Sequence, residues 1–263
     1  NVALVFTMER PVMDRDRLYA LWTQAQEHPT QGWDFSHLDG RMESGALPWD
    51  YRAIVLARLR PDSRLLDMGT GGGEFLLGLG HPHRLTSVTE GYAPNLALCQ
   101  ERLSPLGIEV KAVREDNRLD FPGECFDLII NRHEDLSAPE IFRCLKPGGM
   151  FITQQVGGGN NHDLAKRLIP GCAPSFPDHT LSANVRLLEA AGFEVIRREE
   201  AFPRVRFYDV AALVYFAGII QWEFPGFSVD TSFEQLISLQ EELETTGHID
   251  GTEHRFLIAA AKK

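Results

Sequence analysis

Long apolar runs are scarce in this 263-residue sequence. The most apolar run, AALVYFAGII at 211–220, is about half of the roughly twenty residues that span a bilayer, so it suits a buried helix. The first residues show neither the basic flank nor the cleavage-like site of a secretory leader. We therefore expect a cytoplasmic protein without a membrane partner.

Positive charge is also in deficit. The 26 Lys and Arg residues stand against 37 Asp and Glu residues and leave a net charge of −11 at pH 7. Proteins that hold nucleic acid draw much of their affinity from neutralised phosphates, and no basic run of that kind is present. Nucleic acid is therefore a disfavoured partner, although a local basic patch can coexist with a negative total.

Cysteine occurs only four times, at Cys99, Cys125, Cys144 and Cys172. No two of these residues have the close spacing of a metal-binding pair, and most lie within apolar segments. Buried thiols in a reducing compartment are the simplest account. We expect free thiols and no structural metal.

What the sequence does contain is a glycine-rich segment, LLDMGTGGGEFL at 65–76. Gly69 permits a positive φ in a turn, and Gly71 and Gly73 let backbone N–H groups approach a ligand closely. This pattern predicts a buried strand that turns into a helix around a small ligand. The alternative is a glycine-rich turn that binds no ligand. The dinucleotide fingerprint requires glycine at 74, where this chain has Glu74, so hydride-transfer cofactors are disfavoured.

A second strand, LTSVTEGY at 85–92, contains Glu90 at its end. An acid at the end of the second parallel strand can accept hydrogen bonds from both hydroxyls of an unphosphorylated ribose. A solvated surface glutamate is the alternative. Glu90 therefore indicates a nucleoside without choosing which one.

The pattern Asp-x-Gly-x-Gly-x-Gly at 67–73 resembles motif I of class I S-adenosylmethionine (SAM)-dependent methyltransferases. Residues 110–133 are similar to the stretch of that family which covers the adenine and leads into the fourth strand. EIFRCLKPGGMFITQQ at 140–155 resembles its following helix, turn and fifth strand. The resemblance implies that SAM is the cofactor and that these residues contact it: Asp67, Gly69, Thr70, Gly71, Gly73, Glu90, Gly91, Asp116, Asn117, Asn131 and Tyr51.

Candidate catalytic residues directly follow the fourth predicted strand, 126–131. His133 can accept a proton from a hydroxyl or amine near neutral pH, or it can be a loop histidine that bonds the backbone. Arg132 can hold a substrate carboxylate or pair with Glu134. Methyl transfer is an in-line displacement, so a base is needed only where the nucleophile must lose a proton.

The expected fold is α/β: a Rossmann-like, seven-stranded, mostly parallel sheet with an antiparallel last strand. Residues 1–60 are predicted to form an N-terminal helical cap, with helices at 14–27 and 48–59. Residues 61–202 would form the SAM-binding core, including a flexible loop at 157–164. Residues 203–250 would be a helical lid between strands six and seven, and 251–263 the last strand of the core.

These predictions favour a methyltransferase that acts on O or N of a small-molecule acceptor. A weaker resemblance connects Phe207-Tyr208-Asp209-Val210 and the apolar helix after it to bacterial rRNA guanine-N1 methyltransferases, so RNA methylation is one alternative. A SAM-binding protein without catalysis is the other. Neither the acceptor nor the oligomeric state is encoded in a recognisable pattern.

Overall fold

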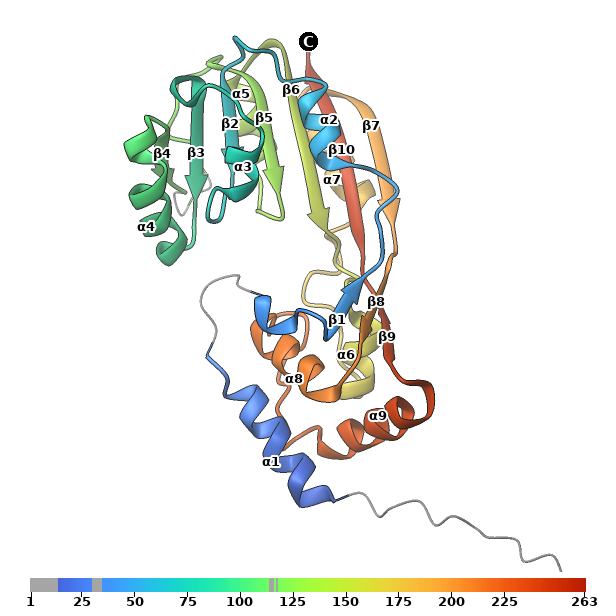
Figure 1. Ribbon diagram of the computed structural model, residues 1–263. Helices are drawn as coiled ribbons and strands as arrows, with labels where there is room; N and C mark the ends of the chain where they lie inside the picture. The colour runs from blue at the N-terminus through green and yellow to red at the C-terminus, as the bar shows by residue number, and fades with distance from the viewer. Residues whose placement is uncertain (1–13, 30–34, 114–115, 117) are drawn as a thin grey trace, which may run out of the picture.

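The computed structural model describes residues 14–29, 35–113, 116 and 118–263, and it is a sheet with helices on both faces joined to a second, mostly helical lobe (Figure 1). The main sheet has seven strands in the order β4-β3-β2-β5-β6-β10-β7. Only β10 runs antiparallel to both of its neighbours, as predicted for the last strand. Their bounds are β2 Leu65–Met68, β3 Thr86–Glu90, β4 Glu109–Ala112, β5 Phe126–Arg132, β6 Leu145–Val156, β7 Phe193–Ala201 and β10 Arg255–Lys262.

Both faces of the sheet are covered, which explains why its central strands are apolar along their whole length. On one face Leu65 and Leu128 pack with α2 (Tyr51–Leu56), α3 (Glu74–Gly78) and α4 (Ala93–Arg102). On the other face Leu66 and Ile129 pack with α5 (Ala138–Cys144) and α7 (Leu181–Ala190). Alternate residues of one strand thus point into two different apolar layers.

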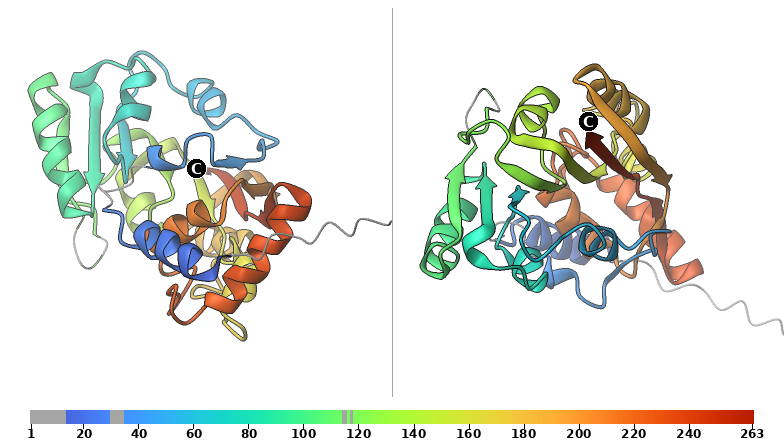
Figure 2. Two further views of the ribbon diagram at one scale, coloured as in Figure 1. Left: turned by 60° about the horizontal axis from the view of Figure 1, so that its bottom comes forward. Right: turned by 90° about the horizontal axis from the view of Figure 1, so that it is seen from above.

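The second lobe lies beyond the carboxyl ends of the parallel strands (Figure 1). It contains α1 (Arg15–Gln26), α6 (His162–Leu168), α8 (Val210–Ile219) and α9 (Phe233–Thr246) around one apolar cluster. Helix α8 is buried along nearly its whole length, as the apolar run at 211–220 predicts. Figure 2 shows α1 lying beside α8, so the N-terminal segment and the segment after β7 build this lobe together. No described helix has the length and apolarity to cross a membrane.

A three-stranded sheet of order β1-β8-β9 in this lobe was not predicted. It joins β1 (Met42–Ser44), β8 (Arg204–Phe207) and β9 (Ile249–Thr252), with Met42 opposite Phe207 and Phe207 opposite Ile249. Strands of three or four residues are too short for an alternating pattern to be visible. The segment expected as a purely helical lid therefore also carries strands. Short 3-10 turns complete the described elements at Ser36–Leu38, His83–Leu85 and Ser104–Leu106.

Two local predictions were wrong. The helix expected over 48–59 begins at Tyr51, because Asp50 is its N-cap and accepts a hydrogen bond from the Ala53 N–H at 3.0 Å, and it ends at Leu56. The loop expected to be flexible over 157–164 is instead fixed: Asn160 and Asn161 are buried, and α6 begins at His162. Polar, glycine-rich composition suggested mobility, but Glu223 of the second lobe accepts hydrogen bonds from both asparagines and holds this segment in place.

Candidate functional site

The predicted glycine loop connects β2 to α3, and three of its glycines have positive φ: 66° at Gly69, 62° at Gly71 and 81° at Gly73. A Cβ on Gly69 would lie 2.5 Å from the Cβ of Glu134. Both this clash and the positive φ exclude a side chain at this position. A Cβ on Gly71 would meet nothing within 4 Å. The space beside the Gly71 Cα is therefore open, whereas the N–H groups of Gly71 and Gly73, expected to face a ligand, donate to Glu90 and to the Thr70 carbonyl.

Glu90 organises this loop. Its Oε2 accepts the Gly71 N–H at 2.8 Å, and its Oε1 accepts the N–H groups of Gly91 and Tyr92 at 2.9 Å each. The side chain is 3% exposed, so a solvated surface glutamate does not describe it. The acid predicted to hold a ribose thus also fixes the backbone of the loop that would hold the rest of the ligand.

Two further carboxyl groups lie beside the loop. Asp67, at the end of β2, accepts a hydrogen bond from Thr70 Oγ1 at 2.8 Å, and burial raises its pKa to about 7. Glu134 crosses the loop between Gly69 and Gly91. Burial, followed by the charges of Glu90 and Asp135, raises the pKa of Glu134 to about 7. Ionising both groups beside Glu90 is costly unless a cation is present.

The expected cofactor fits these residues. SAM carries an ammonium and a sulfonium against a single carboxylate, so it brings net positive charge to a loop surrounded by Asp67, Glu90 and Glu134. The free space beside the Gly71 Cα admits a ligand where a side chain would block it. These residues would hold the cofactor, and Asp116 and Asn117 remain the predicted adenine contacts. Asn117 lies outside the described residues, and Asp116 Oδ1 accepts the Arg118 N–H at 3.1 Å.

Asp67 is expected to make the ligand-free protein less stable as the pH rises. Its ordinary pKa is 3.8 and its folded pKa about 7, so the native state binds more protons than the unfolded state between those values. The loss of stability caused by ionising buried Asp67 appears as the pH rises through that window and is complete above about pH 7. The Asp67→Asn variant removes this loss, so its unfolding free energy relative to wild type should increase by up to about 1.4 kcal/mol per pH unit there.

Urea unfolding of both proteins between about pH 5 and about pH 8 measures this difference. Asp127→Asn is the matched control, since the bond with Lys146 and other partners outweigh burial and keep the pKa of Asp127 below its ordinary value. Its difference from wild type should be flat over the same range. A flat difference for Asp67→Asn would contradict the electrostatic account of the loop.

Asn131 is a buried junction at the end of β5. Its Oδ1 accepts hydrogen bonds from Thr153 Oγ1 at 3.0 Å and Gln155 Nε2 at 2.6 Å, and its Nδ2 donates to the Glu134 carbonyl at 3.2 Å. The Tyr51 hydroxyl donates to the Asn131 carbonyl at 2.9 Å. Both predicted cofactor contacts are thus occupied by protein partners, and Asn131 places the backbone of Glu134 over the loop. Their contact with the cofactor stays a prediction.

His133 and Arg132 face different partners from those considered in the sequence. The Arg132 guanidinium carbon lies 4.7 Å from the ring centroid of Phe75, and among the described residues no ion pair joins it to Glu134. His133 has a left-handed backbone with φ of 65°, and its N–H donates to the Gln154 carbonyl at 2.9 Å. His133 as a residue is exposed, yet crowding of the ring by protein atoms, then Arg255 and Arg132, lowers its pKa below the ordinary value. The imidazole is therefore neutral at pH 7.

Two residues beside His133 had no assigned role in the sequence. Gln154 Nε2 lies 3.3 Å from His133 Nε2, and Trp49 Nε1 donates to Gln154 Oε1 at 2.8 Å. Neither is among the residues predicted for the site, and Gln154 belongs to a strand that is mostly buried. Only the position of Gln154 at the carboxyl end of its strand could have indicated a place in the site.

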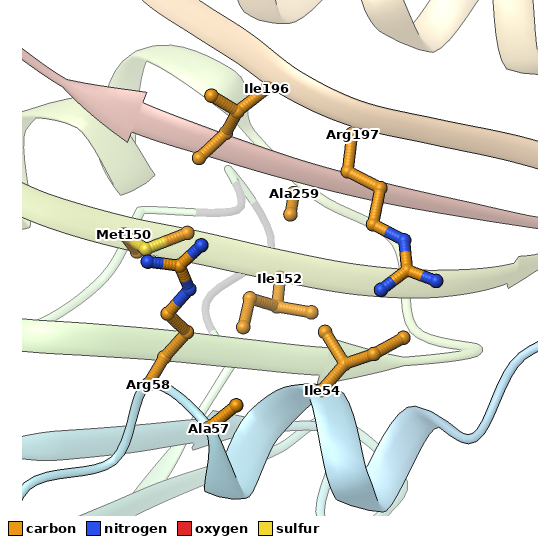
Figure 3. Close-up of a pocket in the computed structure, with 8 residues that line it drawn as sticks. All are labelled: Ile54, Ala57, Arg58, Met150, Ile152, Ile196, Arg197 and Ala259. Carbon is orange, nitrogen blue, oxygen red and sulfur yellow. The ribbon is translucent and has the colours of Figure 1, made fainter.

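A separate recess of about 250 Å³ lies on the α2 face of the sheet (Figure 3). Arg58, just after α2, and Arg197 of β7 flank it, and Met150 and Ile152 of β6 form part of its floor. These strand residues precede Gln154, so the recess lies along the sheet face and away from the carboxyl end of β6. It is therefore outside the candidate site.

Comparison with known proteins finds similarity to methyltransferases. Residues 66–153 match the family model described as a methyltransferase domain. A curated relative, the demethylmenaquinone methyltransferase of Thermus thermophilus, is 29% identical over 116 residues, which are 40% of this chain and 53% of that protein. The chain thus spans about half the length of the curated relative that it matches.

Two solved structures share the fold. A putative methyltransferase from Bacillus halodurans has a TM-score of 0.52 and 16% identity, and the match covers 81% of this chain and 98% of that one. The YcgJ protein from Bacillus subtilis has a TM-score of 0.53 and 18% identity with the same coverage, 81% and 98%. At these identities the likeness establishes the fold alone, and it confirms the architecture predicted from the sequence.

Proposed function

Residues 66–153 form a methyltransferase domain with the class I, Rossmann-like fold, for which SAM is the cofactor, and on that premise we propose that the protein methylates O or N of a small-molecule acceptor. The observation that carries the proposal is the glycine loop, which leaves free space beside Gly71, is held by Glu90 and is surrounded by carboxylates. Such a loop suits a cationic nucleoside better than a phosphate-bearing one.

The chain's own residues would bind and orient the two reactants. SAM, when bound, supplies an electrophilic methyl group on a positively charged sulfur. Glu90 and the glycine backbone would hold the cofactor, and Glu134 would lie against it from the side of β5. Arg132, the last residue of β5, and His133, which follows it, would meet the acceptor. Holding the nucleophile in line with the methyl group is the main catalytic requirement.

A small-molecule acceptor is favoured over RNA by the net charge of −11. The name of the curated relative, demethylmenaquinone methyltransferase, also points away from RNA as the acceptor. The segment that resembles rRNA methyltransferases has a structural role here: Asp209 caps α8 by accepting the Ala212 N–H at 2.7 Å and pairs with Arg41 at 2.7 Å. RNA methylation stays the second candidate because that resemblance includes the helix after Asp209.

Calorimetric titration tests the cofactor first. SAM and its demethylated product are expected to bind in the micromolar range, and NADH is not expected to bind. Incubation with SAM that carries a labelled methyl group then tests the acceptor, with a low-mass metabolite extract and total RNA as separate substrates. Label in the low-mass fraction supports the proposal, and label in RNA assigns the second candidate. A folded protein that does not bind SAM overturns both, and SAM binding without transfer to either fraction indicates a catalytically silent protein.

A further inference from the structure

His133 stands where the acceptor would have to approach. It follows β5 directly, and β5 lies beside β2, with Asn131 opposite Met68, so His133 and the glycine loop share one edge of the sheet. Its left-handed φ of 65° is unusual for a residue with a side chain. The bond from its N–H to the Gln154 carbonyl holds that conformation. The backbone thus aims this ring by a specific, strained arrangement.

The hydrogen bonds around Gln154 determine which nitrogen of His133 carries the proton. An indole N–H can only donate, so the Gln154 atom 2.8 Å from Trp49 Nε1 must be the carbonyl oxygen. The amide nitrogen of Gln154 therefore faces His133 Nε2, at 3.3 Å, and an amide nitrogen also only donates. His133 Nε2 must accept, so the proton of the neutral ring is on Nδ1.

Nδ1–H has no hydrogen-bond partner in the part of the chain that the structure describes, and His133 is an exposed residue. Arg132 is close enough to act on the charge of His133, and its guanidinium, stacked on Phe75, also has no ion-pair partner among the described side chains. A guanidinium and a neutral imidazole N–H both donate and neither accepts. Together they present donors, with net positive charge, to whatever binds after β5.

We propose that His133 is a hydrogen-bond donor, held in its Nδ1–H tautomer by Trp49 and Gln154, and that with Arg132 it selects acceptors that carry an anionic oxygen, such as a carboxylate or phenolate. The substrate class rests on the proposed function, whereas the tautomer does not. His133 Nε2 is engaged by Gln154 and is not free to take a proton from the substrate. An acceptor that binds already ionised needs no base.

The tautomer is tested by nitrogen NMR of the full chain labelled with ¹⁵N-histidine, without any ligand. At neutral pH we expect Nδ1 of His133 to be protonated and Nε2 to be unprotonated, with the signals assigned by a His133→Gln variant. His81 is the internal control: its Nε2 lies 2.7 Å from the Ser63 carbonyl and must donate, so it should show the opposite tautomer. A charged ring, or a proton on Nε2 of His133, overturns the proposal.

The control of His133 by Gln154 is tested by Gln154→Glu. A carboxylate opposite Nε2 should draw a proton onto the ring and raise the pKa of His133 by about 1 to 3 units in an NMR titration. Gln154→Ala removes the amide without adding charge, so it should loosen the tautomer preference while leaving the ring neutral. Equal pKa values in the two variants would show that Gln154 does not act on His133, and would overturn the positioning role of Trp49 and Gln154.

The acceptor class is tested with benzoate and benzylamine, two probes of similar size and opposite charge. Benzoate is expected to shift the His133 Nδ1 signal in a saturable way, and the shift should be lost in Arg132→Gln. Benzylamine should leave the signal unchanged. Equal shifts from both probes, or none from benzoate, overturn the anionic-oxygen assignment even where the tautomer is as proposed. Because no arm of these NMR experiments requires SAM, their failure is distinguishable from failure of the proposed function.

Discussion

The Glu90→Ala variant is expected to bind SAM about a hundredfold more weakly than the wild type. The substitution removes the predicted ribose acceptor and also leaves the N–H groups of Gly71, Gly91 and Tyr92 without the carboxylate that orients them. A lost hydrogen bond to a charged group contributes about 1.5 to 3 kcal/mol, and about 2.8 kcal/mol corresponds to a hundredfold change in Kd. Calorimetric titration of the folded variant with SAM measures the loss.

Glu101→Gln is a suitable control, because Glu101 lies exposed on α4 and its replacement makes the same change in charge. Its affinity for SAM should equal that of the wild type. The affinity of Glu90→Gln for SAM should fall between that of the wild type and that of Glu90→Ala, since one oxygen remains to accept hydrogen bonds from the loop. Wild-type affinity in a folded Glu90→Ala protein would contradict both the ribose assignment and the role of Glu90 in shaping the loop.

The Glu223→Ala variant is expected to lose about 2 to 6 kcal/mol of unfolding free energy. Glu223 Oε1 and Oε2 accept hydrogen bonds from Asn160 Nδ2 at 2.8 and 2.9 Å, and Oε2 accepts one from Asn161 Nδ2 at 2.7 Å. Both asparagines are buried, so alanine leaves two amide groups unpaired at about 1 to 3 kcal/mol each. Urea denaturation followed by circular dichroism measures the change.

The lost stability should come from the junction between the sheet and the second lobe. Glu223 follows α8, whereas Asn160 and Asn161 follow β6, so the bond ties two parts of the chain together. Glu234→Ala is the matched control, because the pair of Glu234 with Arg15 is exposed and such pairs contribute about 0 to 1 kcal/mol. Equal stability of the two variants would show that the junction does not depend on Glu223.

Much of the core was predictable because its signals are local. A run of buried residues followed by alternating glycines requires a strand, a turn and a helix wherever the segment lies in space, and β2, Gly69–Gly73 and α3 have that form. The position of Glu90 at the end of a strand also follows from its neighbours in sequence. The order and direction of the strands then follow from the short connections between them and the right-handed crossover rule.

Local signals failed in two places. The helix predicted from Pro48 begins only at Tyr51, because the side chain of Asp50 makes a better cap than the ring of Pro48. The segment at 157–164 has the composition of a mobile loop, yet Glu223 fixes it from 62 or 63 residues away in sequence. Composition describes what a segment can do when alone, whereas the segment at 157–164 has a partner elsewhere in the fold.

The sequence by itself determined the α/β fold, the glycine loop and the acid beside it, because backbone conformation and burial period are properties of neighbouring residues. Only the tertiary structure decided the state of the side chains at the site. It placed Glu134 against Gly69, and it brought Trp49 and Gln154 to one side of His133 from separate parts of the chain. The charge and tautomer of a side chain depend on how far it lies from other groups, because electrostatic interactions weaken with distance. Those distances join residues that are far apart in sequence, so no short stretch of sequence encodes them.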